Sequence, residues 1–217
     1  MPPATYQTYL NEIVKILMIR LQSRMAGRSP TAFAVELIYT LSVMIGKLGP
    51  DVLTGALETL QAGMTKMFTE TVWLPNVTKV RGRNEKKATV IGLTRFLCES
   101  EFCLSNMDIW KGVLEAAVNV LEDVEESASV VKDADEALLD LEQTGYEAGF
   151  SKLHFASIVP TDLLGEYPVA RNYFVTSLSA LSSKRPGVYL AFVGQSCPAP
   201  VQQRLQSYFA QYNATFQ

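Results

Sequence analysis

Hydrophobic residues recur at helical spacing along almost the whole chain. The first series places apolar side chains on one face of a predicted helix and consists of Leu10, Ile13, Val14, Leu17, Met18 and Leu21. We predict that this helix ends near Gly27, because glycine commonly follows helix ends and Ser29-Pro30 restarts the chain. Residues 31–49 are apolar on nearly all sides. This segment is therefore predicted to be a helix sandwiched between neighbours.

Helical spacing continues toward the C-terminus. Leucine and methionine keep it between residues 53 and 67, and in the following TVWLPNVTKV the proline Pro75 interrupts or kinks the helix. The other predicted helices are 85–100 with Asn84 as N-cap, one up to about Val124 with Ser105 or Asn106 as N-cap, 147–157, 169–183, 187–195 and 200–213. Strand signals are nearly absent, since the chain has no sustained period-two alternation and no Asn-Gly or Asp-Gly hairpin turn.

The pattern predicts an all-α fold. Helices of about 10 to 20 residues joined by short turns favour antiparallel neighbours, and both a closed bundle and an open α-solenoid fit this description. An amphipathic helix is followed by a more apolar one, and such pairs recur at roughly 40 to 50 residues, which is the spacing of HEAT-type repeats. We therefore favour an α-solenoid of stacked HEAT-type antiparallel helix pairs that extends over residues 1–217.

Composition limits the classes of function. Hydrophobic residues make up 48% of the chain and charged residues 19%, whereas a typical soluble domain has roughly 25% charged residues. The net charge of −3 argues against nucleic-acid binding, which needs an excess of lysine and arginine. The longest apolar run, residues 37–46, is far shorter than the roughly 20 residues of a membrane-spanning helix. With no signal peptide at its start, the chain is expected to be soluble.

The reactive residue types form no recognisable catalytic or metal motif. Cys98, Cys103 and Cys197 contain no CxxC pair, and the single histidine, His154, cannot complete a common zinc site with them. We interpret the cysteines as reduced thiols of a cytosolic or nuclear protein, with Cys98 and Cys103 as small core residues. GxxxxGK[ST], GxSxG and HExxH are all absent. The sequence therefore predicts neither an enzyme nor a bound cofactor, metal or small-molecule substrate.

His154 lies in "DLEQTGYEAGFSKLHFAS", residues 140–157. It has no partner at a fixed spacing, so we interpret it as a packed or surface histidine and not as a catalytic one. Gly145 is expected to end the preceding acidic stretch. The aromatic residues Tyr146, Phe150 and Phe155 would then form the apolar face of a helix that re-enters the stack.

Two charged segments are candidate partner surfaces. Nine acidic residues against the single Lys132 lie between residues 122 and 142, and we treat about 122–145 as an acidic connector. It is either a solvated loop extended by self-repulsion or a negative patch that steers a basic partner. The opposite charge gathers around Gly82, in an exposed turn that is the second candidate. The candidate partner-binding residues are Glu122, Asp123, Glu125 and Glu126, and Lys79, Arg81, Arg83, Lys86 and Lys87.

Two blocks carry a resemblance to a known family. "LPNVTKVRGRNEKKATVIGLTRFLCES", an acidic insert and then "DLEQTGYEAGFSKLHFAS" resemble the C-terminal region of the receptors that re-export importin-α, a branch of the importin-β superfamily. The resemblance extends from "RLQSR" near residue 20 to the closing "LQSYFAQYNATFQ". It implies a superhelix of HEAT repeats without catalytic activity, and a chain that is a C-terminal segment of a longer transport receptor.

The resemblance also implies partners and a location. Such receptors bind importin-α together with Ran-GTP in the nucleus, carry both through the pore and release them in the cytoplasm, so nuclear pore proteins are further candidate partners. Because the first repeats of the family make the main Ran contact, this chain would supply the C-terminal arch. Two alternatives stay open: a generic α-solenoid scaffold for another protein, and an all-α enzyme with His154 as base. The enzyme is disfavoured because no second polar group orients the imidazole.

Overall fold

The computed structural model describes residues 3–25, 30–128 and 161–217, and the side chains of 9–23, 32–123 and 161–217. The elements are α1 (Pro3–Met25), α2 (Pro30–Leu48), α3 (Pro50–Leu60), α4 (Met64–Phe68), a π-helical turn (Thr69–Trp73), α5 (Leu74–Asn76), a 3-10 turn (Val77–Lys79), α6 (Arg83–Glu99), α7 (Glu101–Ser105), α8 (Met107–Ala128), α11 (Ala170–Lys184), α12 (Val188–Ser196) and α13 (Ala199–Gln211). These described ranges contain no strand, and the predicted all-α fold is confirmed.

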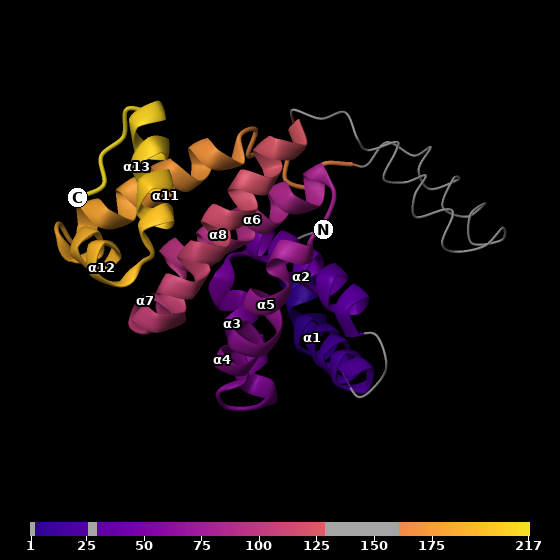
Figure 1. The fold of residues 1–217 in the computed structure, drawn as a ribbon. Coiled ribbons are helices and arrows are strands. Elements are labelled where there is room, and N and C mark those ends of the chain that lie inside the picture. Colours follow the sequence, from indigo (N-terminus) through magenta and orange to yellow (C-terminus); the bar gives the residue numbers. More distant parts are fainter. Residues whose placement is uncertain (1–2, 26–29, 129–160) are drawn as a thin grey trace.

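The helices stack in two layers (Figure 1). One layer contains α2, α6 and α11 in this order, and the other contains α1, α3, the turns before α6, α8 and α13. Helix α6 packs against α2, α8 and α11, and so lies at the centre of the stack. Helices α1 and α13 lie at opposite ends (Figure 1). Successive helices that pack mainly on their neighbours are the expected arrangement of a HEAT-type solenoid, and this prediction is confirmed.

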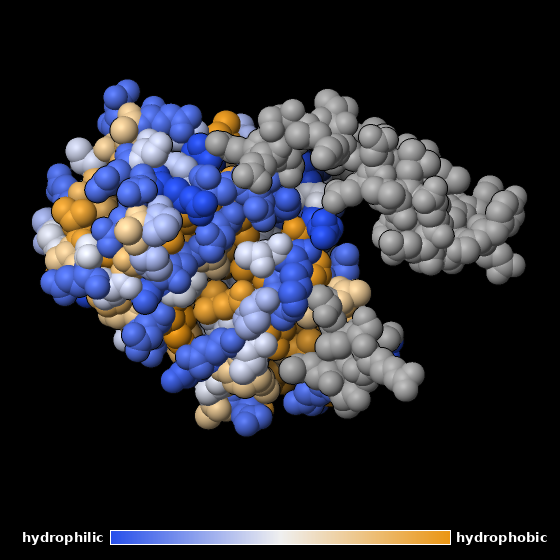
Figure 2. Space-filling view, viewed as in Figure 1, coloured by the Kyte–Doolittle hydropathy of each residue, from blue (hydrophilic) through white to orange (hydrophobic). Residues whose placement is uncertain are grey.

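The core is aromatic at its centre. Trp73, Phe96 and Trp110 are fully buried, and the ring centroids of Trp73 and Phe96 lie 5.2 Å apart. Each such side chain contributes roughly 1.5 to 3 kcal/mol by its burial. In Figure 2 hydrophilic residues cover most of the visible face, and hydrophobic residues show in the hollow at its centre. Residues 31–49 are sandwiched as predicted, because α2 packs against α1, α3 and α6.

The cysteines are small core residues, as predicted for Cys98 and Cys103. All three thiols are free and buried. Burial raises the pKa of the Cys98 thiol to about 12, and it raises the pKa of Cys103 as well. Because a nucleophilic cysteine must reach the thiolate form, these two buried thiols are unsuited to catalysis near neutral pH.

Helix α6 crosses α2 at a glycine. A Cβ atom added to Gly92 would lie 2.7 Å from the Cα and 2.8 Å from the Cβ of Ser42. Only glycine allows this approach without a shift of the backbone. The buried Ser42 hydroxyl is satisfied within its own helix, since it donates to the carbonyl of Ile38 at 2.7 Å.

Two predicted helix boundaries are wrong. Helix α6 begins at Arg83 with Gly82 as N-cap, not after Asn84, because Gly82 has a φ of 85° and its carbonyl accepts from the Lys86 amide at 3.0 Å. The continuous helix predicted over residues 53–67 breaks after Leu60, and Gly63 adopts a left-handed φ of 78°. The Glu58 carboxylate stabilises this break by accepting from the amides of Gly63 at 2.7 Å and Thr65 at 3.0 Å.

Three other predictions are refined. Ile13 was expected on the inner face of the first helix, but it is exposed on the outer face of α1. The segment around Pro75 is irregular as predicted, and the π-helical turn Thr69–Trp73 precedes the proline, which has no N–H to continue a regular helix. Beyond the helix predicted over 85–100, the structure adds the short α7, which contains Cys103 and is capped by the Ser100 side chain.

The predicted acidic connector lies only partly within the described residues. Residues 122–128 form the last turns of α8, so the acidic run begins on a helix. The rest of the connector, the helix predicted over 147–157 and His154 lie outside the described residues. Their assignments remain predictions.

Candidate partner-binding site

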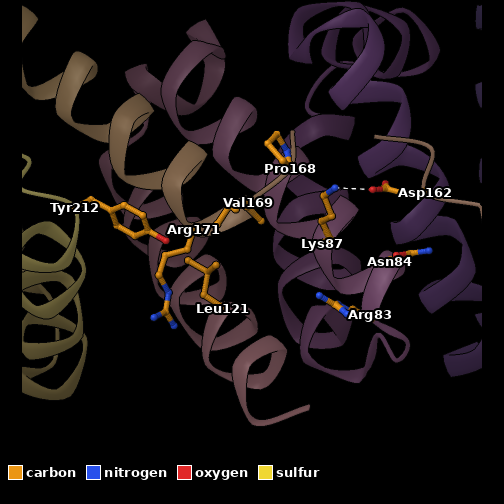
Figure 3. Close-up of a pocket in the computed structure, with 10 residues that line it drawn as sticks. Arg83, Asn84, Lys87, Leu121, Asp162, Pro168, Val169, Arg171 and Tyr212 are labelled. Atoms are coloured by element: carbon orange, nitrogen blue, oxygen red, sulfur yellow. Dashed lines mark hydrogen bonds and ion pairs between the residues drawn. The ribbon is translucent and has the colours of Figure 1, made fainter. Parts of the chain in front are cut away.

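A cavity of about 360 Å³ lies where the first turns of α6 and α11 meet α8 and the residue that follows α13 (Figure 3). We refer to it as the basic pocket. Its lining residues are Arg83, Asn84, Lys87, Leu121, Asp162, Pro168, Val169, Ala170, Arg171 and Tyr212. Two of the five basic candidates from the sequence, Arg83 and Lys87, are among them.

The backbone directs two helix N-termini at this pocket. Helix α6 begins at Arg83 because Gly82 turns the chain there, and α11 begins at Ala170 after the extended Val169, whose φ is −127°. Each helix N-terminus carries a partial positive charge of roughly half an elementary charge. The lining contains three basic side chains, Arg83, Lys87 and Arg171, and one acidic side chain, Asp162. Lys87 pairs with Asp162 and Arg171 with Glu122 of α8, so the excess positive charge comes from Arg83 and the two helix N-termini. This excess suits the pocket to a carboxylate.

Lys87 anchors the chain that returns to the stack. Its ammonium nitrogen lies 2.6 Å from a carboxylate oxygen of Asp162 (dashed line in Figure 3). This hydrogen bond holds the pKa of Asp162 below its ordinary value, against the opposing effect of burial. The other oxygen of Asp162 accepts from the Leu164 amide at 3.0 Å, and Leu164 is fully buried against Gly46. Lys87 thus has a structural role, and its charge is partly neutralised.

Arg83 is the basic candidate best placed to meet a partner. Its side chain is exposed at the edge of the basic pocket, in the first turn of α6. It forms no ion pair with the side chains that the structure describes. An exposed guanidinium above a partly apolar hollow can bind a carboxylate through two parallel N–H bonds.

Glu122 connects three helices. From α8, its carboxylate lies 3.7 Å from the guanidinium groups of Arg171 in α11 and Arg204 in α13. It also accepts a hydrogen bond from the Tyr208 hydroxyl, and the Arg171 guanidinium lies 4.2 Å above the Tyr208 ring. Burial and then this bond raise the pKa of Tyr208. Glu122 is therefore part of the contact between helices, and a role in partner binding stays a prediction.

The structure brings one acidic and one basic candidate together and leaves others apart. The Lys86 ammonium lies 3.5 Å from the Asp123 carbonyl oxygen, so the basic turn borders the start of the acidic run. Lys79 donates to the Asn76 side chain at 2.9 Å, and Arg81 is exposed in the turn before α6. Glu125 and Glu126 belong to α8, but their side chains lie outside the described residues.

Eight of the ten lining residues were not site candidates in the sequence, among them Asp162, Arg171 and Tyr212. Asp162 and Tyr212 have no local signal, because only the tertiary fold brings them to α6. Arg171 had one, since it shares helical spacing with the apolar Phe174, Val175 and Leu178. A charged residue on the apolar face of a helix indicates either a buried ion pair or a binding site, and Arg171 is indeed buried.

The described residues were also searched for a metal-binding cluster and for a membrane-spanning helix. No group of three or more His, Cys, Asp and Glu side chains in the described ranges is arranged to hold a metal ion. None of the described helices combines the length and the hydropathy that a membrane crossing requires.

Comparison with known proteins identifies the family. The model for the C-terminus of CAS/CSE proteins matches residues 1–208. Exportin-2 of Xenopus laevis is 31% identical over 215 residues, which cover 96% of this chain and 21% of that protein, and exportin-2 of Homo sapiens is 29% identical over 224 residues, covering 99% and 22%. No solved structure matches significantly. The chain spans about a fifth of the length of these curated relatives.

These relatives are named as export receptors, in agreement with the expectation that the chain is not an enzyme. The match includes both charged segments and every residue of the basic pocket except Tyr212, which lies beyond residue 208. The chain belongs to the CAS/CSE family and corresponds to the C-terminal region of its members.

Proposed function

We propose that this chain acts as the C-terminal arch of a nuclear export receptor, where it helps to bind importin-α together with Ran-GTP for the return of importin-α to the cytoplasm. The observation that carries this function is the family match over residues 1–208. Relatives that match nearly the whole chain are named exportin-2. A receptor with this export function would be found in both the nucleus and the cytoplasm. Nuclear pore proteins would be additional partners during transit.

The two-layer stack suits such a role. In an α-solenoid each helix pair contacts mainly its neighbours, so small rotations between pairs add up along the array. Binding energy gained at one surface can then be balanced against a change in superhelix shape. A receptor that must hold two partners and later release both needs this property.

Within this function, the basic pocket would bind an acidic segment of the partner. Its electropositive lining and its apolar side chains Leu121, Val169 and Tyr212 suit a carboxylate beside an aliphatic or aromatic group. Arg83 would make the outermost contact. The acidic run from Asp123 onward would face a basic part of the complex and increase its association rate at low salt.

The function can be tested in a chimera. The matched C-terminal region of Xenopus laevis exportin-2 is replaced by this chain, and binding of importin-α is measured with and without Ran-GTP. The expected result is importin-α binding that depends on Ran-GTP. A chimera that has the helical content and gel-filtration volume of the parent exportin-2 but fails to bind importin-α with Ran-GTP would contradict the proposed function.

A further inference from the structure

The ion pair of Lys87 and Asp162 lies inside the basic pocket. Both residues line the cavity, and the Lys87 ammonium lies 2.6 Å from a carboxylate oxygen of Asp162 (Figure 3). The Asp162 side chain is 36% exposed, whereas the Lys87 side chain is 13% exposed. The carboxylate is thus the accessible member of the pair, and it occupies a cation that a bound carboxylate would also pair with.

Lys87 lies one helical turn after Arg83. Residues four apart lie on the same side of a helix, and both of these side chains line the pocket. An acidic segment of a partner that binds Arg83 would therefore bring negative charge toward Lys87. At Lys87 it would compete with Asp162.

The fold can give up this ion pair without releasing the chain around it. Asp162 lies outside the helices, in the irregular stretch before α11. One of its carboxylate oxygens pairs with Lys87, and the other accepts from the Leu164 amide at 3.0 Å, so loss of the first bond leaves the second in place. Leu164 is fully buried, and Glu166 pairs with Lys47 at 2.6 Å. The stretch therefore stays anchored without Lys87.

We propose that Asp162 is an internal stand-in for a partner carboxylate: it holds Lys87 in the free chain, and an acidic segment that enters the basic pocket displaces it. This inference rests on the proposed function and names the contact that the partner must replace. Lys87 is paired in both states, because one carboxylate replaces another. The released Asp162 keeps a cation nearby, since Lys47 also helps to hold the pKa of Asp162 down. Asp162 thus lowers the affinity of the pocket and makes binding easier to reverse.

The exchange is tested on the 217-residue chain by an NMR titration at low salt with the peptide acetyl-Glu-Glu-Phe-Glu-Glu. This peptide combines carboxylates with an aromatic group, which suit the basic and the apolar parts of the lining. Binding should shift the amide signals of the first turn of α6. Asp162→Asn should bind the peptide about two- to fivefold more tightly, as expected when a partly exposed ion pair no longer competes.

Glu166→Gln is the matched control. It removes the other ion pair of the same stretch, in which a lysine also lies 2.6 Å from the carboxylate, but neither Glu166 nor Lys47 lines the pocket. This variant should bind the peptide as the parent chain does, and circular dichroism checks that each variant is folded. An affinity of Asp162→Asn no higher than that of Glu166→Gln would overturn the exchange, as would a lack of binding by all three chains.

A double variant tests whether Lys87 itself receives the ligand. Lys87→Gln combined with Asp162→Asn should bind the peptide about fivefold more weakly than Asp162→Asn alone, because the ammonium group is missing. Residue 162 is uncharged in both variants, so repulsion by Asp162 cannot cause the difference. Equal affinities would overturn the exchange at Lys87.

The exportin-2 chimera separates this inference from the proposed function. There Asp162→Asn should raise the affinity for importin-α with Ran-GTP by a similar factor. A chimera that fails to bind importin-α while the peptide results hold would contradict the proposed function and support the exchange. A chimera that binds importin-α no more tightly with Asp162→Asn than without it would overturn the exchange as a determinant of partner binding.

Discussion

At the scale of single residues, Gly92 determines how closely α2 and α6 can approach. Because an added Cβ would lie 2.7 Å from the Cα of Ser42, Gly92→Ala must push the two helices apart. We expect the free energy of unfolding to fall by about 1 to 3 kcal/mol, the usual cost of overpacking. Urea denaturation measures this change.

Gly55→Ala is the matched control for that substitution. Gly55 lies in α3, and a Cβ added there meets no atom within 4 Å. Since alanine favours helices more than glycine does, this variant should be more stable by up to about 1 kcal/mol. Equal effects of the two substitutions would show that the close crossing of α2 and α6 does not limit stability.

The Lys87–Asp162 ion pair should make the stability of the fold depend on pH. Its hydrogen bond lowers the pKa of Asp162 in the folded state, so the pair contributes stability above the ordinary aspartate pKa of about 4 and loses it as pH falls through the lower folded value. Asp162→Asn should therefore reduce stability at pH 7 by up to about 1 kcal/mol, since the pair is partly exposed. Thermal unfolding from pH 7 down to acid measures the difference.

That difference between Asp162→Asn and the parent chain should shrink below about pH 4. Glu36→Gln, at an exposed position of α2, serves as control and should change stability by less than about 0.5 kcal/mol. A loss from Asp162→Asn that is as large in acid as at pH 7 would rule out the ion pair as its cause.

At the scale of elements, Glu122 couples α8 to α11 and α13. Glu122→Gln removes the charge that faces Arg171 and Arg204. We expect a loss of about 1 to 3 kcal/mol, because the buried guanidinium of Arg171 loses an ion-pair partner and the Tyr208 hydroxyl loses a charged acceptor. Hydrogen exchange should show reduced amide protection in α13 in particular. Glu70→Gln, from an exposed pair within one segment, is the control and should cost a few tenths of a kcal/mol. Unchanged protection of α13 would contradict the coupling.

The helices could be predicted from the sequence better than their ends and faces. Periodicity identified α2, α6 and α8 because apolar residues recur at a fixed spacing whatever the neighbours are. The break after Leu60 was missed because its cause is a tertiary detail, the Glu58 carboxylate binding two amides. The outer face of α1 was missed because a pattern shows which residues are apolar but not which side of the helix has a neighbour.

For the basic pocket, too, the sequence showed which residues are charged but not which partners they have in the fold. Arg83 and Lys87 are close in sequence, so their shared charge was visible as a cluster around Gly82. The cluster could not show that Lys87 binds Asp162, 75 residues later in the chain, while Arg83 stays exposed. Likewise, Glu122 belonged to an acidic run in the sequence but pairs with arginines of two other helices in the fold.

At the scale of the whole molecule, the stack has two surfaces of different character. The basic pocket lies between α6, α8 and α11 in the middle of the array, and the outer face of α1 lies at one end. We propose that the pocket contributes to the partner surface of an export receptor.

The central claim is that the basic pocket contributes directly to partner binding, and charge reversal at Arg83 tests it most directly. Importin-α binding to the exportin-2 chimera is measured with Ran-GTP at low and at high salt. Arg83→Glu should weaken binding about tenfold or more at low salt and much less at high salt, since exposed charges are screened. Arg185→Glu, at an exposed arginine after α11, should change little. Equal affinities for Arg83→Glu and Arg185→Glu at both salt concentrations would contradict the claim.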